Sequence, residues 1–246
     1  MPRRPRSSGN CKAAATDPEE MMSNPSGASV WPEPFDLSFV HGEITTDGRT
    51  LERLTVRAVV LRGDELLLVH SRVNGDLMFP GGGIEAGESH HGALARELLE
   101  ECGAELLDVG ALLGETREYR AARELGFDAY CIRSLYYLCR IGEQLVAPQP
   151  QAYEIRLGFV PGWFAIDEAL QTNKTQLAGP CPQWTARETR VLAQLQRWHQ
   201  QGRFEEACRS GVTREALRLS LSSISGVAAR LACSYSGRLH DSDCCK

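Results

Sequence analysis

The chain has 246 residues, 42% of them hydrophobic and 24% charged, which is ordinary globular composition with room for one sizeable core. Its formal net charge of -5 argues against a surface built to hold nucleic acid or anionic membrane. No segment approaches the roughly 20 consecutive apolar residues of a membrane-spanning helix. The nine cysteines form no CxxC pair, so we expect free thiols. These features predict a soluble, cytoplasmic protein without stable nucleic-acid or membrane partners.

The two ends of the chain differ in composition from its middle. Residues 1–34 are rich in Pro, Ser, Gly and charge, and they show no apolar periodicity, so we expect a disordered leader. Basic residues near the start are not followed by an apolar core, which excludes a secretory signal but leaves a transit signal open. Residues 201–246 are expected to be a poorly ordered or locally helical tail. One catalytic domain is therefore predicted over residues 35–200.

The first predicted elements are two strands and a helix. Residues 54–61 and 65–70 are apolar runs joined by a tight turn that contains Gly63. Residues 78–83 contain a proline and three glycines and should form a loop. A helix is expected to begin near Glu88 or Ser89 and to end at Gly103.

The second half of this region predicts a mixed sheet closed by helices. Residues 106–119 and 127–140 are strand-like, and residues 154–164 are expected to form a strand interrupted at Pro161 and Gly162. Asp167 is expected to cap a short helix. Residues 185–199 place their apolar side chains on one helix face, which should cover the core, namely Val191, Leu195 and Trp198.

Three glutamates of the first predicted helix share one face. At about 100° per residue, Glu97 and Glu101 differ by about 40°, and Glu100 lies about 60° to their other side. Like charges at this spacing destabilise a helix, a cost that a divalent cation reverses, and clustered carboxylates suit Mg²⁺ or Mn²⁺. The alternative is a solvated helix face on which Arg96 forms an ordinary surface ion pair with Glu100.

The complete spacing around these glutamates favours the metal hypothesis, because it resembles the Nudix box G-x5-E-x7-R-E-U-x-E-E-x-G-U, where U is bulky and apolar. The pattern spans residues 82–104, here called the box, and the final position departs from it because Ala104 is small. The matching residues are Gly82, Glu88, Arg96, Glu97, Leu98, Glu100, Glu101 and Gly103.

The resemblance implies an α/β fold, a Nudix α/β/α sandwich with a mixed β-sheet, in which the box forms a loop, a helix and a loop. It also implies Mg²⁺, or Mn²⁺, held mainly by Glu97, Glu100 and Glu101. Glu88 becomes a supporting ligand and the Gly82 carbonyl a candidate ligand. Arg96 becomes the residue that orients the glutamates. A related domain often dimerises, so a homodimer is left open by analogy.

Residues outside the box are weaker candidates. Family members take their general base either from the box or from a loop outside it, and the outside candidates here are Glu115, Glu118 and Glu154. Arg57, Arg72, Phe79 and Glu154 are predicted substrate contacts, the arginines because guanidinium groups bind phosphate. An aromatic residue that stacks on a base is sought among Tyr119, Tyr130, Tyr153 and Phe159. His90 and His91 are expected to be exposed helix residues.

The expected reaction is Mg²⁺-dependent cleavage of a diphosphate bond in a small-molecule nucleotide. Nucleoside triphosphates, giving NMP and pyrophosphate, rank first. ADP-ribose or nucleotide sugars come next, then dinucleoside polyphosphates. A regulatory module that binds a nucleotide without cutting it is disfavoured because the box is intact, and RNA cap hydrolysis ranks low because the basic residues lie in the leader.

Overall fold

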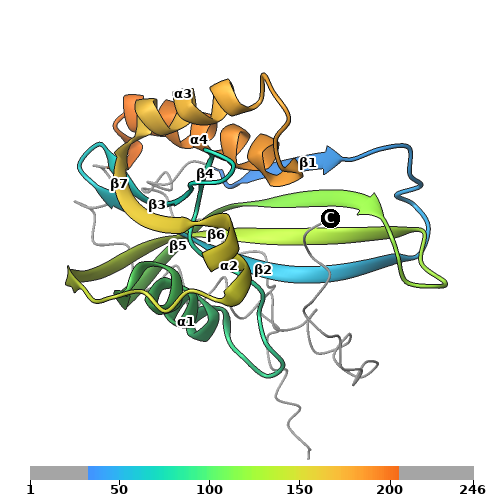
Figure 1. Ribbon diagram of the computed structural model, residues 1–246, viewed down its shortest axis with the longest axis horizontal. Coiled ribbons are helices and arrows are strands. Elements are labelled where there is room, and N and C mark those ends of the chain that lie inside the picture. Colours follow the sequence, from blue (N-terminus) through green and yellow to red (C-terminus); the bar gives the residue numbers. More distant parts are fainter. Residues whose placement is uncertain (1–32, 205–246) are drawn as a thin grey trace, which may run out of the picture.

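A computed structural model describes residues 33–204, in which a mixed sheet has helices on both faces (Figure 1). The strands are β1 (Phe35–Val40), β2 (Thr50–Arg62), β3 (Glu65–Ser71), β4 (Leu77–Met78), β5 (Ala104–Ala121), β6 (Ala129–Leu145) and β7 (Phe159–Ala165). The helices are α1 (His90–Cys102), α2 (Ala152–Leu157), α3 (Ile166–Gln176) and α4 (Gln183–Gln200). Helix α1 lies on one side of the sheet and α3 and α4 on the other, so the predicted α/β/α sandwich is confirmed.

The strands run in the order β1-β5-β6-β2-β3-β4, and β7 pairs with β3. Strands β1 and β5 are parallel, as are β2 and β6, whereas the other pairs are antiparallel. Strand β2 pairs with β6 along most of its length but with β3 only next to the turn at Gly63. Beyond that turn β3 pairs with β7, which brings the chain following α2 back to the centre of the molecule.

Each face of the sheet has its own apolar core. Alternate side chains of β2 point to opposite faces, so Val56 and Ala58 pack toward α1 while Val59 packs toward α4. Leu94 and Leu98 of α1 are fully buried against the first face. On the second face, α4 buries the predicted stripe of Val191, Leu195 and Trp198, which confirms that this helix covers the core.

Two predictions about the segment around residue 154 were wrong. Residues 152–157 form α2 rather than the start of a strand, because Gln151 and Glu154 form a reciprocal capping box that favours a helix. Strand β7 then runs without interruption through Pro161 and Gly162. Proline is tolerated there because β7 pairs on one side only, with β3, so its missing amide costs no second ladder bond.

The structure also bears on the predictions made for Asp167, for the cysteines and for the two ends of the chain. Asp167 does not cap α3: the N-cap is Ala165, and Asp167 accepts a 2.6 Å hydrogen bond from Gln196 of α4. Cys131 and Cys139 are free and buried, as expected of thiols packed as small hydrophobes. None of the described helices is long and apolar enough to cross a membrane. The chain is ordered in a strand from Phe35, while most of the predicted leader and tail lie outside the described residues.

Candidate active site

The loop of residues 79–84, which leads into the box, lies along the edge of β2 that does not pair with β6. Backbone hydrogen bonds join Ala58 N to Pro80 O at 2.8 Å, Val56 N to Gly82 O at 3.0 Å, and Ile84 N to Leu54 O at 3.3 Å. Gly81 has a positive φ of 140°, and a Cβ there would lie 2.1 Å from the Val56 carbonyl oxygen. Glycine is therefore required at residue 81 for the loop to lie this close to the strand.

Helix α1 begins and ends at the residues that its sequence predicts. The Ser89 hydroxyl accepts a 3.0 Å hydrogen bond from Gly92 N, and Gly103 ends the helix in the left-handed conformation. Because Leu94 and Leu98 pack on the sheet, the adjoining face with Glu97 and Glu101 is directed at the loop. The predicted shared face of glutamates is thus present, and it is half-buried rather than solvated.

Arg96 joins the two halves of the box. Its Nε donates to Glu88 Oε1 at 3.0 Å, its Nη1 to Glu97 Oε1 at 2.7 Å, and its Nη2 to the Gly83 carbonyl at 2.9 Å. Glu100 lies 3.7 Å from Nη1. The Arg96 hydrogen bond lowers the pKa of Glu88, which stays ionised. Arg96 therefore holds two carboxylates and the loop backbone in a fixed orientation.

Glu101 is, with Glu97, one of two buried glutamates of the box helix. Its Oε2 accepts a 2.8 Å hydrogen bond from the Gly81 amide. Burial, followed by the charge of Glu97, raises the pKa of Glu101 well above its ordinary value, and burial also raises the pKa of Glu97. Two buried carboxylates side by side favour either a proton or a cation between them.

A further carboxylate reaches this cluster from α2. Glu154 is 1% exposed, and its Oε2 accepts a 2.6 Å hydrogen bond from Gln151 N. The charge of Glu154 contributes to the raised pKa of Glu101, which places the two groups near each other. Gln151 also directs its side-chain amide at Glu100 Oε2, 3.5 Å away. The short helix α2 therefore forms part of the same site as the box.

The donor set has the chemistry that a hard divalent cation prefers. Box carboxylates and Glu154 surround the site, and Arg96 and Arg57 are the positive charges that act on Glu97 and Glu101. Among residues 33–204, however, no three acidic, histidine or cysteine side chains are already arranged as a complete ligand shell. Glu88 and Glu97 instead hydrogen-bond Arg96. The residues fit a metal by their chemistry.

Comparison with known domains identifies the family. A NUDIX domain is matched over residues 51–206, well over half of the chain. The chain belongs to the Nudix family. It is accordingly a hydrolase that acts on phosphoric anhydrides. No curated protein matches the chain.

Solved Nudix structures are similar over about half of the chain. A mutator MutT protein from Bacillus halodurans is 22% identical, with 49% of this chain and 72% of that chain covered and a TM-score of 0.38. A NUDIX hydrolase from Nitrosomonas europaea is 26% identical over 56% of this chain and 85% of that one, with a TM-score of 0.37. A MutT NUDIX hydrolase from Burkholderia pseudomallei is 21% identical, covering 57% and 97%, with a TM-score of 0.36. The assignment rests on the domain match.

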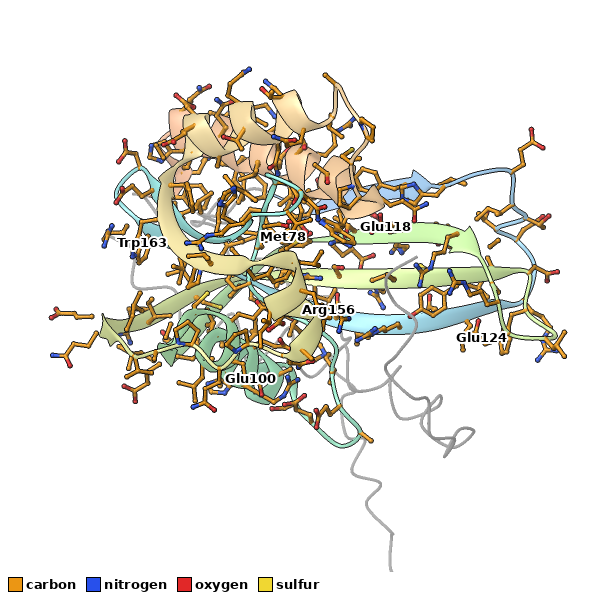
Figure 2. All side chains as sticks on the ribbon, viewed as in Figure 1. Met78, Glu100, Glu118, Glu124, Arg156 and Trp163 are labelled. Atoms are coloured by element: carbon orange, nitrogen blue, oxygen red, sulfur yellow. The ribbon has the colours of Figure 1, made fainter. Side chains whose placement is uncertain are left out.

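The other two outside glutamates form ion pairs with residues outside the Nudix box. Glu115 is held by Arg117 and by Arg133, the latter at 2.6 Å. Glu118 pairs with His41 and with Arg187 on the face that α4 covers. Figure 2 shows Glu118 and Glu100 on opposite sides of the sheet. Of the three candidates for an outside base, Glu154 is the one whose charge acts on a box glutamate, Glu101.

The structure places the predicted substrate contacts Phe79, Arg57 and Arg72 in three different environments. Phe79 is 1% exposed and packs edge-on against Tyr136 with ring centres 5.6 Å apart, so it is a core residue and its prediction as a substrate contact was wrong. Arg57 donates to the Phe79 and Gly81 carbonyls at 3.3 and 2.5 Å and so holds the loop. Arg72 is exposed beside Gly158, at the end of α2. Its role as a phosphate contact stays a prediction.

The structure also places Gly82 and the two histidines of the box. The Gly82 carbonyl accepts the Val56 amide within the sheet ladder, and a Cβ at Gly82 would lie 2.3 Å from Glu97 Oε1. The absence of a side chain at Gly82 makes room for Glu97. Because the Gly82 carbonyl already accepts the Val56 amide, we leave it out of the metal ligands proposed below. His91 is exposed as predicted, whereas His90 is half-buried, with Nδ1 2.8 Å from the Tyr137 hydroxyl.

Sequence reasoning missed two groups near the Nudix box. Arg53 lies against the loop, since a Cβ at Gly83 would be 2.8 Å from its Nη2. Its position two and four residues before Thr55 and Arg57 on one strand face was the available signal. Arg187 and Glu188 are buried residues of α4 itself, and Glu188 accepts a hydrogen bond from the Phe79 amide. The prediction for this helix considered only its apolar side chains, so it did not select them. The signal was available, because two charged residues precede the apolar stripe.

Proposed function

We propose that this Nudix protein is a Mg²⁺-dependent pyrophosphohydrolase that cleaves a nucleoside triphosphate into NMP and pyrophosphate. The observation that supports this most directly is the pair of buried carboxylates Glu97 and Glu101. Burial raises the pKa of both groups, and Arg96 does not offset it. A divalent cation at this place would favour the ionised form of both.

The proposed ligands are Glu97, Glu100 and Glu101, with Glu88 as a supporting ligand. When bound, Mg²⁺ supplies charge neutralisation of the diphosphate, activation of a water and stabilisation of the leaving phosphate. Glu100 is the most exposed of the four and lies at the open side of the cluster. Arg96 holds Glu88 and Glu97 in place through its hydrogen bonds. Mn²⁺ is expected to substitute for Mg²⁺, since both prefer oxygen ligands.

Glu154 is proposed as the general base that takes the proton of the attacking water. It is the outside carboxylate nearest the box, and the Gln151 amide fixes one of its oxygens. The Glu154 side chain also hydrogen-bonds Tyr153, the residue before it on α2. This role replaces its earlier prediction as a substrate contact, because a residue that is 1% exposed offers little surface to a nucleotide. Arg72 is proposed to contact the phosphates from the rim.

The ordering of substrates rests on the layout of the domain. One Nudix domain with no second folded unit among residues 33–204 resembles nucleoside triphosphate pyrophosphatases of the mutator type. ADP-ribose, nucleotide sugars and dinucleoside polyphosphates are the alternatives. A regulatory module without catalysis is the candidate from another class, and the intact set of Arg96, Glu97, Glu100 and Glu101 argues against it.

A substrate panel tests the proposal. Phosphate and pyrophosphate release would be measured with Mg²⁺ on nucleoside triphosphates, ADP-ribose, nucleotide sugars and dinucleoside polyphosphates. We expect turnover that is lost in Glu100→Gln and kept in Glu105→Gln, where an exposed glutamate on β5 loses the same charge. Binding of nucleotides without turnover on any of these compounds would overturn the catalytic reading and favour the regulatory one.

A further inference from the structure

A chain of buried ion pairs joins α4 to the loop that opens the Nudix box. We propose that Arg187 and Glu188 are positioning residues, which hold residues 79–81 so that Glu101 is correctly placed for the metal. This inference rests on the metal role proposed above. It assigns a part in metal binding to α4, which otherwise covers the core.

Glu188 is the point at which α4 contacts the loop. The residue has no exposed surface, and its Oε2 accepts a 3.3 Å hydrogen bond from the backbone amide of Phe79. Its other oxygen, Oε1, accepts from Arg187 Nε at 3.2 Å and Nη2 at 2.8 Å. A single buried carboxylate therefore binds a guanidinium on its own helix and a backbone amide of the loop.

Arg187 anchors this carboxylate to the sheet. Its Nη1 donates to Glu118 Oε2 on β5 at 2.6 Å, and Glu118 Oε1 lies 2.8 Å from His41 Nε2. Arg187 is only 3% exposed, and the nearby charges of Glu188 and Glu118 keep its pKa raised although burial opposes this. Helix α4 and strand β5 thus fix Glu188 from two directions.

From Phe79 the connection continues to Glu101 through the loop backbone. Arg57 Nη1 binds the carbonyls of Phe79 and Gly81, at 3.3 and 2.5 Å. The amide of Gly81 in turn donates to Glu101 Oε2 at 2.8 Å. Glu188 on one side and Arg57 on the other therefore hold both backbone groups of Phe79, two residues before the amide that orients Glu101.

A need for stability alone does not explain these charges. Burying an ion pair costs desolvation that its Coulomb attraction often only offsets, and apolar residues of similar size serve as well or better. From Val191 onward the buried residues of α4 are apolar, among them Leu192 and Leu195. The charged pair occurs where the helix meets the loop, which is where a directional hydrogen bond is needed. Groups that orient metal ligands typically affect metal affinity by about 10–100-fold.

The test measures equilibrium Mn²⁺ binding without substrate, by the EPR signal of free Mn²⁺, together with the thermal unfolding midpoint of each variant. Glu188→Leu removes the acceptor for the Phe79 amide, and we expect Mn²⁺ binding weakened about 10-fold or more. Glu188→Gln keeps an acceptor of the same length and should restore binding to within about threefold. Leu195→Ala, which loosens α4 but leaves the hydrogen bond from the Phe79 amide to Glu188 in place, is the matched control, with a lower midpoint and unchanged Mn²⁺ binding.

Three outcomes would overturn the inference. They are wild-type Mn²⁺ binding in folded Glu188→Leu, weakening in Glu188→Gln as large as in Glu188→Leu, and equal weakening in Leu195→Ala. If Glu188→Leu does not fold, Glu188→Asp replaces it, since its shorter side chain cannot reach Arg187 and Phe79 together. Intermediate Mn²⁺ affinity is then expected, and wild-type affinity would overturn the inference. Glu100→Gln is run in parallel: wild-type Mn²⁺ binding there would contradict the metal site itself rather than its positioning.

Discussion

The backbone amide of Gly81 donates a 2.8 Å hydrogen bond to the buried carboxylate of Glu101, which joins the glycine loop to the box helix. The bond requires the loop to lie close against β2, where only glycine fits at residue 81. The loop, the strand and the helix are therefore one unit, and a disturbance of the loop is expected to reach the glutamates directly.

Gly81→Ala is the first prediction. Its Cβ would lie 2.1 Å from the Val56 carbonyl oxygen, in a backbone conformation with φ of +140°. We expect a loss of about 1–3 kcal/mol in the free energy of unfolding from the backbone strain alone, and loss of turnover because the amide moves away from Glu101. Gly63→Ala is the matched control: it also has a positive φ, of +64°, but nothing lies within 4 Å. Denaturant unfolding and turnover of both variants provide the measurement, and full activity in Gly81→Ala would refute the prediction.

The second prediction concerns pH. Burial raises the folded-state pKa of Glu101 well above its ordinary value of 4.5. The carboxyl therefore stabilises the fold when protonated, a contribution that is complete below the unfolded pKa and lost as pH rises through the raised folded pKa. Without metal, the unfolding midpoint of the wild type should fall relative to Glu101→Gln as pH rises from about 5 to about 8.

Mg²⁺ should reverse this trend, because a cation stabilises the ionised carboxylates. Midpoints in EDTA and in Mg²⁺ across the same pH range provide the comparison. Parallel pH profiles for the wild type and Glu101→Gln in EDTA would show that Glu101 titrates normally in the folded protein, contrary to its burial.

Arg96→Lys is the third prediction. Lysine keeps the positive charge but cannot donate at once to Glu88, Glu97 and the Gly83 carbonyl, as the planar guanidinium does. We expect kcat to fall by about 10–100-fold, as is typical when a group that orients metal ligands is lost. Arg140→Lys, on an exposed position of β6, should leave kcat unchanged. Equal kcat values for wild type and Arg96→Lys would mean that charge alone matters there.

Glu154→Gln is the fourth prediction. If Glu154 is the base, kcat should drop by about 100-fold or more, while Mn²⁺ binding to the box glutamates persists. Glu115→Gln is the comparison, because the two oxygens of Glu115 are held by Arg117 and Arg133. Steady-state kinetics with Mn²⁺ binding separates the two roles. A large loss of Mn²⁺ binding in Glu154→Gln would instead make this residue a metal ligand, and an unchanged kcat would remove it from the site.

The box could be read from the sequence because its geometry is local. Glu97, Glu100 and Glu101 share a face by helix periodicity alone, and Ser89 and Gly103 bound the helix by their own chemistry. The strands β2, β3, β5 and β6 and the apolar stripe of α4 follow from equally local patterns. These features determine the fold class and half of the candidate site.

The remainder depends on contacts between distant parts of the chain. The place of Glu154 beside Glu101 depends on how α2 folds back, and the sequence suggested a strand there. Phe79 looked like a substrate contact but fills the core against Tyr136, which comes from a strand much later in the chain. The pairing of Arg187 with Glu118 likewise requires α4 to lie over β5.

Product analysis by phosphorus NMR tests the central claim most directly, with a nucleoside triphosphate, Mg²⁺, and either the wild type or Glu101→Gln. The account predicts NMP and pyrophosphate resonances that appear only with Mg²⁺ and the wild-type chain, and an unchanged substrate spectrum with folded Glu101→Gln. Pyrophosphate release at the wild-type rate by folded Glu101→Gln, or in the presence of EDTA, would contradict it.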